Sequence, residues 1–211
     1  MNPADWRPTA TIEVMRKRAG MLARARAWFA AERVLEVQTP LLSFAAVSEP
    51  QIESIAAAPL SGPARYLQTS PEYPMKRLLA TGIGDCYQIC PVFRDGESGR
   101  QHNPEFTMIE WYRVGFDVAE LQQDVDRLLR ATIAGLRPLA PARQLTYHDA
   151  IAESCGLDCR TAGPREIEAV LQSRGVAPLV AGEQDRDAWL DLLMATVVGP
   201  LLGRDAPVFV R

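Results

Sequence analysis

The spacing of apolar residues predicts a long amphipathic helix near the start of the chain. Between residues 12 and 32, apolar side chains recur every three or four positions, at Val14, Ala19, Leu22, Ala25, Trp28 and Phe29. This is the period of one helix face. Most cations of the segment lie off that stripe, and we interpret them as a solvated face, with a docking surface for an acidic partner as the alternative. A short buried strand at 34–37 should follow and stop before Pro40, which lacks the amide hydrogen that a central strand needs.

Strict alternation predicts a β-hairpin in the middle of the chain. Residues 86–93 and 105–113 are each typical of a strand, and the polar segment 95–103, with two glycines, joins them. In the second strand the residues that alternate onto one side are Phe106, Met108, Glu110 and Tyr112. One side of this hairpin therefore carries a carboxylate among large apolar side chains.

The rest of the chain is predicted to contain a loop, short strands and several helices. Three prolines interrupt residues 43–65, so we predict a loop there with a strand near 52–55, followed by a strand at 66–69. Ser70 should cap a helix that has Pro71 at its first position and continues through Leu79. Further helices are predicted at 117–136, 146–155, 164–174 and 185–198, with a last strand at 207–210. We expect one domain over residues 1–211, with a helical insertion at about 138–200.

Composition and charge narrow the possible classes. The chain has 211 residues, of which 47% are hydrophobic and 23% charged, as in an ordinary globular protein. Its 23 Lys and Arg against 26 Asp and Glu give a net charge of -3, so any contact with a polyanion must be local. No apolar run reaches about 18 residues and the N-terminus lacks a leader-like apolar core, so we expect no membrane span and a cytoplasmic protein.

Four cysteines form two C-x3-C pairs, Cys86 with Cys90 and Cys155 with Cys159. This spacing is not the usual zinc hook. Along a strand, Cys86 and Cys90 are about 13 Å apart, which is too far for a disulfide. We interpret the cysteines as small buried thiols in a reducing compartment, with a structural zinc site as the alternative.

Glu110 is the first candidate for chemistry, because an ionised group inside a strand costs several kcal/mol to bury without a cationic partner. Structural pairing with Arg94 would meet that need. A functional reading is also open, since Arg94, Phe106, Glu110 and Tyr112 can share one face. An aromatic ring can stack on a base, a guanidinium can clamp phosphate or carboxylate, and a carboxylate beside a phenol can hold an ammonium group. Glu72 could add a second anionic contact, or could serve only its helix dipole.

These segments resemble a known family. Residues 93–113, FRDGESGRQHNPEFTMIEWYR, are similar to motif 2 of class II aminoacyl-tRNA synthetases, specifically of the lysyl branch. The basic helix leading into VLEVQTPLL resembles motif 1, and TSPEY at 69–73 occurs between the two in the matching order. The resemblance covers most of residues 10–120. It implies an α+β fold, with a class II synthetase-like antiparallel sheet flanked by helices and a motif 1 helix that builds a homodimer.

Within this family the start of the chain favours one group. Lysyl-tRNA synthetases carry an N-terminal barrel for the anticodon, whereas motif 1 begins here near residue 12, so we expect no anticodon-binding domain. The chain therefore looks like the truncated lysyl-tRNA synthetase paralogues that ligate (R)-β-lysine to a lysine of translation elongation factor P. Two alternatives stay open: a lysine-activating enzyme with another acceptor, and a catalytically dead nucleotide-binding module.

The resemblance also implies roles for single residues, with ATP and Mg²⁺ as cofactors. Arg94 would bind the α-phosphate and the amino-acid carboxylate, and Phe106 would stack on adenine. The other expected ATP contacts are Glu97, Arg100, His102 and Asn103. The amino groups of (R)-β-lysine or lysine would be received by Glu72, Glu110 and Tyr112, with Ser70 shaping the pocket.

Two departures from the family pattern shape these expectations. Gly96, followed by Glu97, stands where lysyl-tRNA synthetases have a glutamate, so either Glu97 makes the adenine contact or that contact is absent. Nothing in the sequence matches motif 3 or the late acidic residues that would hold Mg²⁺, which should lie beyond residue 211. We therefore expect a catalytic domain that is incomplete at its C-terminus and does not turn over alone.

Overall fold

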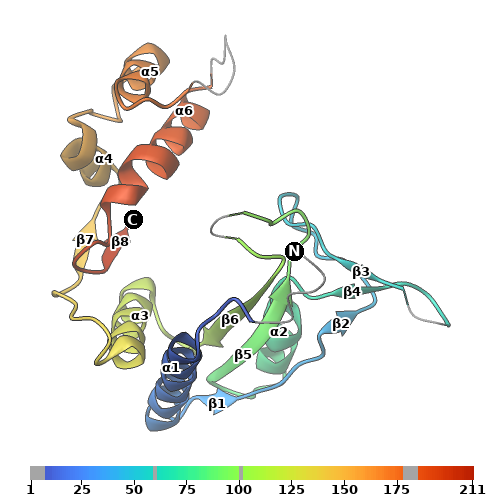
Figure 1. Ribbon diagram of the computed structural model, residues 1–211. Coiled ribbons are helices and arrows are strands. Elements are labelled where there is room, and N and C mark those ends of the chain that lie inside the picture. Colours follow the sequence, from blue (N-terminus) through green and yellow to red (C-terminus); the bar gives the residue numbers. More distant parts are fainter. Residues whose placement is uncertain (1–7, 59–60, 100–101, 178–184) are drawn as a thin grey trace. The chain divides into compact units, whose positions relative to one another are not determined.

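The computed structural model describes residues 8–58, 61–99, 102–177 and 185–211, which form two compact units (Figure 1). The first unit extends to Gln123 and the second comprises Asp124–Arg211. Helix α3 (Val118–Ile133) crosses this boundary. None of the helices that the structure describes is long and apolar enough to cross a membrane.

The described residues of the first unit form two complete helices, the start of α3 and two small sheets. Its helices are α1 (Ile12–Ala31) and α2 (Glu72–Ala80). Its strands are β1 (Leu35–Glu36), β2 (Leu42–Ser43), β3 (Ala56–Ala57), β4 (Arg65–Leu67), β5 (Cys86–Phe93) and β6 (Glu105–Tyr112). The strands pair in the orders β1-β5-β6 and β2-β4-β3.

The prediction of an antiparallel sheet flanked by helices needs a correction. Strands β5 and β6 are antiparallel, and so is the β2-β4-β3 sheet, but β1 runs parallel to β5. The chain enters β5 after α2 rather than through a hairpin from β1, and a crossover of this kind joins parallel strands. The main sheet is therefore mixed.

Helices α1 and α2 cover opposite faces of the β5–β6 hairpin. On one face, Phe29 of α1 is fully buried and stacks on Tyr87 with ring centroids 3.9 Å apart. On the other face, Met75 of α2 is fully buried in a cluster with Val37 and Cys86. Because neighbouring strand residues point to opposite faces, odd-numbered β5 residues lie on the α1 side, where Tyr87 contacts Phe29, and even-numbered residues lie on the α2 side.

The register of β5 and β6 decides which side chains share the α2 face. Cys86 is opposite Tyr112, Gln88 opposite Glu110, Cys90 opposite Met108 and Val92 opposite Phe106. Cross-strand partners lie on the same face of a sheet. Phe106, Met108, Glu110 and Tyr112 therefore share one face, as the alternation predicted.

Two local expectations in the first unit were wrong. The segment 43–65, predicted as a loop, contains β3 and the end of β2, and near 52–55 it forms only an isolated bridge between Glu53 and Asp95. Ser70 is not the N-cap of α2, because the helix begins at Glu72 with Pro71 in the cap position. The Ser70 hydroxyl instead accepts a hydrogen bond from the Glu72 amide at 3.3 Å, which makes a turn before the helix.

The second unit is helical with a small parallel sheet. Its elements after α3 are β7 (Arg143–Leu145), α4 (Tyr147–Cys155), α5 (Pro164–Ser173), α6 (Arg186–Leu193) and β8 (Val208–Val210). Its core includes Ile151, Ile167, Leu171 and Leu193, all fully buried. Thr146 and Asp149 form a capping box at α4, and Gly156 ends that helix in the left-handed region at φ 71°. Strand β7, parallel to β8, was not predicted.

The helix predicted at 185–198 changes type along its length. It is α-helical to Leu193, forms a π turn at Met194–Val198 and a 3₁₀ turn at Gly199–Leu201. Gly199 suits this junction because a Cβ there would lie 3.0 Å from the Met194 carbonyl oxygen. All four cysteines are free, and Cys86, Cys90 and Cys159 are buried as predicted, while Cys155 is partly exposed.

Candidate active site

Arg94 lies directly after β5, where the hairpin opens into its loop. Its amide donates to the Pro104 carbonyl at 2.9 Å, and its Nε donates to the Thr69 carbonyl at 3.3 Å. The guanidinium lies 5.2 Å from the centre of the Phe106 ring and its side chain is 23% exposed. A partly exposed guanidinium beside an aromatic ring offers a fork for phosphate or carboxylate and a flat face for a base. Arg94 and Phe106 therefore lie next to each other, and their roles toward a ligand stay predictions.

Glu110 is held by Tyr112 rather than by Arg94. The Tyr112 hydroxyl donates to Glu110 Oε1 at 2.7 Å, whereas the ion pair of Arg94 is with Glu97 at 3.5 Å. Burial raises the pKa of Glu110, and the nearby Glu72 carboxylate raises it further, while the Tyr112 hydrogen bond and the Lys76 ammonium oppose that shift. Burial and the Glu110 carboxylate raise the pKa of Tyr112, so its hydroxyl stays protonated. This pair presents a half-buried carboxylate in a fixed orientation.

Glu72 stands in the first turn of α2, which brings a second carboxylate close to Glu110. Its Oε1 accepts from the Lys76 ammonium at 2.5 Å, and the two side chains are 42% and 56% exposed. Glu72 raises the pKa of Lys76, chiefly through this hydrogen bond. Glu72 and Glu110 therefore interact with each other and with one cation. Lys76 was missed in the sequence, although its i,i+4 spacing from Glu72 is the signal that could have found it.

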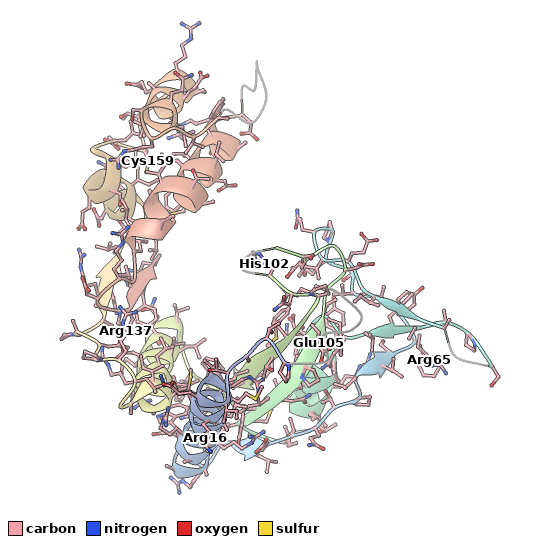
Figure 2. The ribbon with its side chains drawn as sticks, in the orientation of Figure 1. Arg16, Arg65, His102, Glu105, Arg137 and Cys159 are labelled. Atoms are coloured by element: carbon pink, nitrogen blue, oxygen red, sulfur yellow. The ribbon has the colours of Figure 1, made fainter. Side chains whose placement is uncertain are left out.

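The loop residues expected to contact ATP fall into three groups. Glu97 meets Arg94, as described. His102 and Asn103 are exposed, and the backbone of His102 pairs with Gly99. Figure 2 shows His102 in the loop between β5 and β6. Arg100 lies outside the described residues.

Ser70 and Glu72 line a cavity of about 370 Å³ beside this face. The cavity is bounded by residues 40–47, by the chain that follows β4, and by the first turns of α2. Arg94, Phe106, Glu110 and Tyr112 are not among its lining residues. The predicted substrate residues thus divide into a cavity group, Ser70 and Glu72, and a sheet group, Glu110 and Tyr112.

Two buried glutamines next to these residues were missed in the sequence. Gln88 is 2% exposed, and its Oε1 accepts from the Thr39 amide at 3.1 Å. Gln68 is 8% exposed, and its Nε2 donates to the Pro91 carbonyl at 3.0 Å. Gln88 breaks the apolar pattern of β5 and was the available signal, because a buried amide requires hydrogen-bond partners.

The described residues offer no cluster of metal-ligating side chains. Across them, no group of three or more histidine, cysteine, aspartate or glutamate side chains is placed to hold a metal ion.

The chain is similar to known proteins along nearly its whole length. The family model for class II tRNA synthetases (D, K and N) matches residues 2–186. The chain is 42% identical over 212 residues to an elongation factor P (R)-β-lysine ligase of Erwinia tasmaniensis. The aligned region covers 98% of the chain and 64% of that relative. Proteins of the same name are 40% identical in Pseudoalteromonas translucida, over 97% of the chain and 64% of the relative, and 39% identical in Vibrio cholerae, over 100% and 65%. The chain spans just under two thirds of the length of these curated relatives.

Proposed function

The chain belongs to the class II tRNA synthetases of the D, K and N group, and from that premise we propose that it forms part of an ATP-dependent ligase. The ligase activates (R)-β-lysine as an adenylate and transfers it to a lysine side chain of elongation factor P. The observation that carries this proposal is the shared face of Phe106, Glu110 and Tyr112 on β6, with the Arg94 guanidinium next to the Phe106 ring. Relatives about 40% identical along nearly the whole chain are named for this activity.

In the first step, a carboxylate oxygen of the amino acid attacks the α-phosphorus of ATP, and pyrophosphate leaves. Arg94 is suited to this step because its guanidinium can contact the attacking carboxylate and the α-phosphate together. Phe106 provides the adenine with a stacking surface 5.2 Å from that guanidinium. Glu97, already paired with Arg94, is proposed to keep the guanidinium oriented and to lie near the adenine. Catalysis then rests mainly on positioning and charge stabilisation.

The amino groups of the substrate are proposed to bind the carboxylates. Glu110, oriented by Tyr112, receives an ammonium group from the sheet side, and Glu72 receives one from the cavity side. Ser70 shapes the cavity next to Glu72. Two separate carboxylates match a substrate with two ammonium groups, and this favours a diamino acid.

In the second step, the uncharged amine of the acceptor lysine attacks the carbonyl carbon of the adenylate. AMP leaves, the nitrogen loses a proton, and an amide bond forms. His102 and Asn103 are proposed to contact the ATP phosphates or the adenine edge from the loop. Because the acceptor is a translation factor, we place the reaction in the cytoplasm.

Mg²⁺ would neutralise phosphate charge in such a reaction. Among the described residues, no group of three or more histidine, cysteine, aspartate or glutamate side chains is placed to hold it. The chemistry assigned to this chain is that of its own arginine, aromatic ring and carboxylates.

A homodimer is also proposed, through α1. Only Ala25 and Phe29 of this helix are buried, whereas Ile12, Val14 and Met15 are 68%, 53% and 43% exposed. We propose that this exposed start of α1 lies in the dimer interface.

The test of the proposed function is a transfer assay with purified elongation factor P, ATP and either (R)-β-lysine or lysine. The full-length gene product is used, because the chain spans under two thirds of its relatives. We expect one lysine of the acceptor to gain the mass of a lysyl residue, faster with (R)-β-lysine than with lysine. Equal or reversed preference, or modification of another acceptor only, would contradict the proposal.

A further inference from the structure

The shared face of β6 contains one residue that the proposed function does not use. Met108 stands between Phe106 and Glu110 on this strand, and the register places all three on the same side of the sheet. Phe106 and Glu110 are about 13 Å apart along the strand, with Met108 halfway between them. Met108 therefore separates the ring proposed to stack on adenine from the carboxylate proposed to bind an ammonium group.

Only the β6 half of this hairpin face is open to a ligand. The β5 residues that lie opposite are nearly closed to solvent: Gln88 is 2%, Cys90 7% and Val92 0% exposed. Phe106, Met108 and Glu110 are each partly exposed. A ligand that reaches from Phe106 to Glu110 therefore lies along β6 and passes over Met108.

The side chain of Met108 suits a hydrocarbon chain rather than an amine. A methionine side chain is flexible and apolar, and its sulfur is only a weak hydrogen-bond acceptor. An ammonium group placed on it would lose water without gaining a strong partner. The order along this face is thus guanidinium, apolar side chain and carboxylate. A diamino acid offers the matching order of carboxylate, methylene groups and ammonium.

We propose that Met108 is a specificity-determining residue, which sets the length of the hydrocarbon chain between the substrate carboxylate and the far amine. This inference rests on the proposed function, because it takes the carboxylate to lie at Arg94 and the far amine at Glu110. The Arg94 side chain is oriented by the Thr69 carbonyl. Glu110 is oriented by the Tyr112 hydroxyl. Since both ends are held, packing on Met108 decides whether one methylene more can be accommodated.

The test measures how binding depends on chain length. Dissociation constants of the full-length gene product are measured calorimetrically for ornithine, lysine and homolysine, which differ by one methylene group each. The wild-type protein should bind lysine about 10-fold more tightly than either of the other two. Met108→Ala leaves space for the extra methylene, so the preference for lysine over homolysine should fall by about 5-fold or more.

Ile109→Ala is the matched control, since it truncates the next residue of β6, which alternation places on the opposite face of the sheet. It should leave the chain-length preference unchanged. Met108→Val removes less of the side chain and keeps a residue suited to a strand, so it provides the readout if Met108→Ala fails to fold. It should lower the preference for lysine over homolysine by about 3-fold.

Three results would overturn the inference: a wild-type protein that binds lysine no more tightly than homolysine, Met108 variants with the wild-type preference, or an equal loss of preference in Ile109→Ala. The outcome is separable from the proposed function. Adenylate formation with a length preference independent of Met108 removes only this inference. A length preference that depends on Met108 in a protein that forms no adenylate supports this site and removes the proposed reaction.

Discussion

The ionisation of Glu110 controls whether the sheet face attracts an ammonium group. Burial raises the pKa of Glu110 from its ordinary value of 4.5, and the Tyr112 hydroxyl opposes that rise through a 2.7 Å hydrogen bond. Only the ionised carboxylate attracts a cation strongly. The contribution of Glu110 to substrate affinity is therefore present above its raised pKa and is lost as the pH falls through it. Its contribution to fold stability has the opposite sense and declines as the pH rises through the same pKa.

Removing the Tyr112 hydroxyl should shift this pH dependence upward. In Tyr112→Phe, Glu110 loses the hydrogen bond that favours its charged form, so its pKa should rise further. We expect the midpoint of the affinity-against-pH curve for lysine to move to higher pH, with about 10-fold weaker binding below the new midpoint. Calorimetric titration from pH 5 to pH 8 measures this. An unmoved midpoint, or one displaced to lower pH, would show that the hydroxyl does not support the charged carboxylate.

The sequence predicted the faces of these residues better than their partners. Alternation places Phe106, Glu110 and Tyr112 on one side whatever surrounds the strand, and the register confirms it. The alternative pairing of Glu110 with Arg94 was wrong, because Tyr112 is two residues away on the same face and Arg94 meets Glu97. Gln68 and Lys76 reach the site only through tertiary packing, which no local pattern encodes.

At the scale of elements, the long helices and strands were predicted from the sequence and the shortest strands were not. Strand β5 occupies 86–93 as predicted, and α1, α3, α4 and α5 fall within three residues of their expected ends. The two-residue strands β2 and β3 are too short for alternation to appear, and their pairing with β4 supplies the hydrogen bonds instead. Strand β7 likewise takes its hydrogen-bond partners from β8, which follows more than sixty residues later in the chain.

Docking of α1 on the hairpin should depend strongly on one residue. Phe29 is fully buried and contacts the Tyr87 ring, so Phe29→Ala leaves a cavity between helix and sheet. Such truncations cost about 3–5 kcal/mol in free energy of unfolding. Urea denaturation followed by circular dichroism measures the loss. Val118→Ala, at a 72% exposed position, is the control and should change stability by less than about 0.5 kcal/mol. A loss below 1 kcal/mol in Phe29→Ala would contradict this packing.

At the scale of the whole molecule, the chain divides into two compact units, and the proposed site lies in the first. The sheet face, the cavity and α1 all belong to the first unit, and α4, α5 and α6 build a separate core in the second. The expectation of one catalytic domain with a helical insertion at about 138–200 stays a prediction. Charge and composition predicted a globular chain but carried no information on this division, because each unit has an ordinary core of its own.

The proposed homodimer can be tested by charging the exposed start of α1. Val14→Glu replaces a 53% exposed apolar side chain near the start of α1 with a carboxylate. We expect the full-length gene product to sediment as a dimer and the variant as a monomer at the same micromolar concentration, because an unpaired charge is costly in an apolar interface. Val118→Glu serves as the control and should stay dimeric. A monomeric wild-type protein, or a dimeric Val14→Glu variant, would exclude α1 as the interface.

The most direct measurement of the central claim is exchange of labelled pyrophosphate into ATP in the presence of (R)-β-lysine. The full-length gene product is compared with Arg94→Ala, and with Arg143→Ala, an exposed arginine of the second unit, as the control. The account predicts exchange that requires the amino acid, is lowered by about 100-fold or more in Arg94→Ala and is unchanged in Arg143→Ala. Exchange at the wild-type rate in Arg94→Ala would contradict the assignment of this hairpin face as the site of adenylate formation.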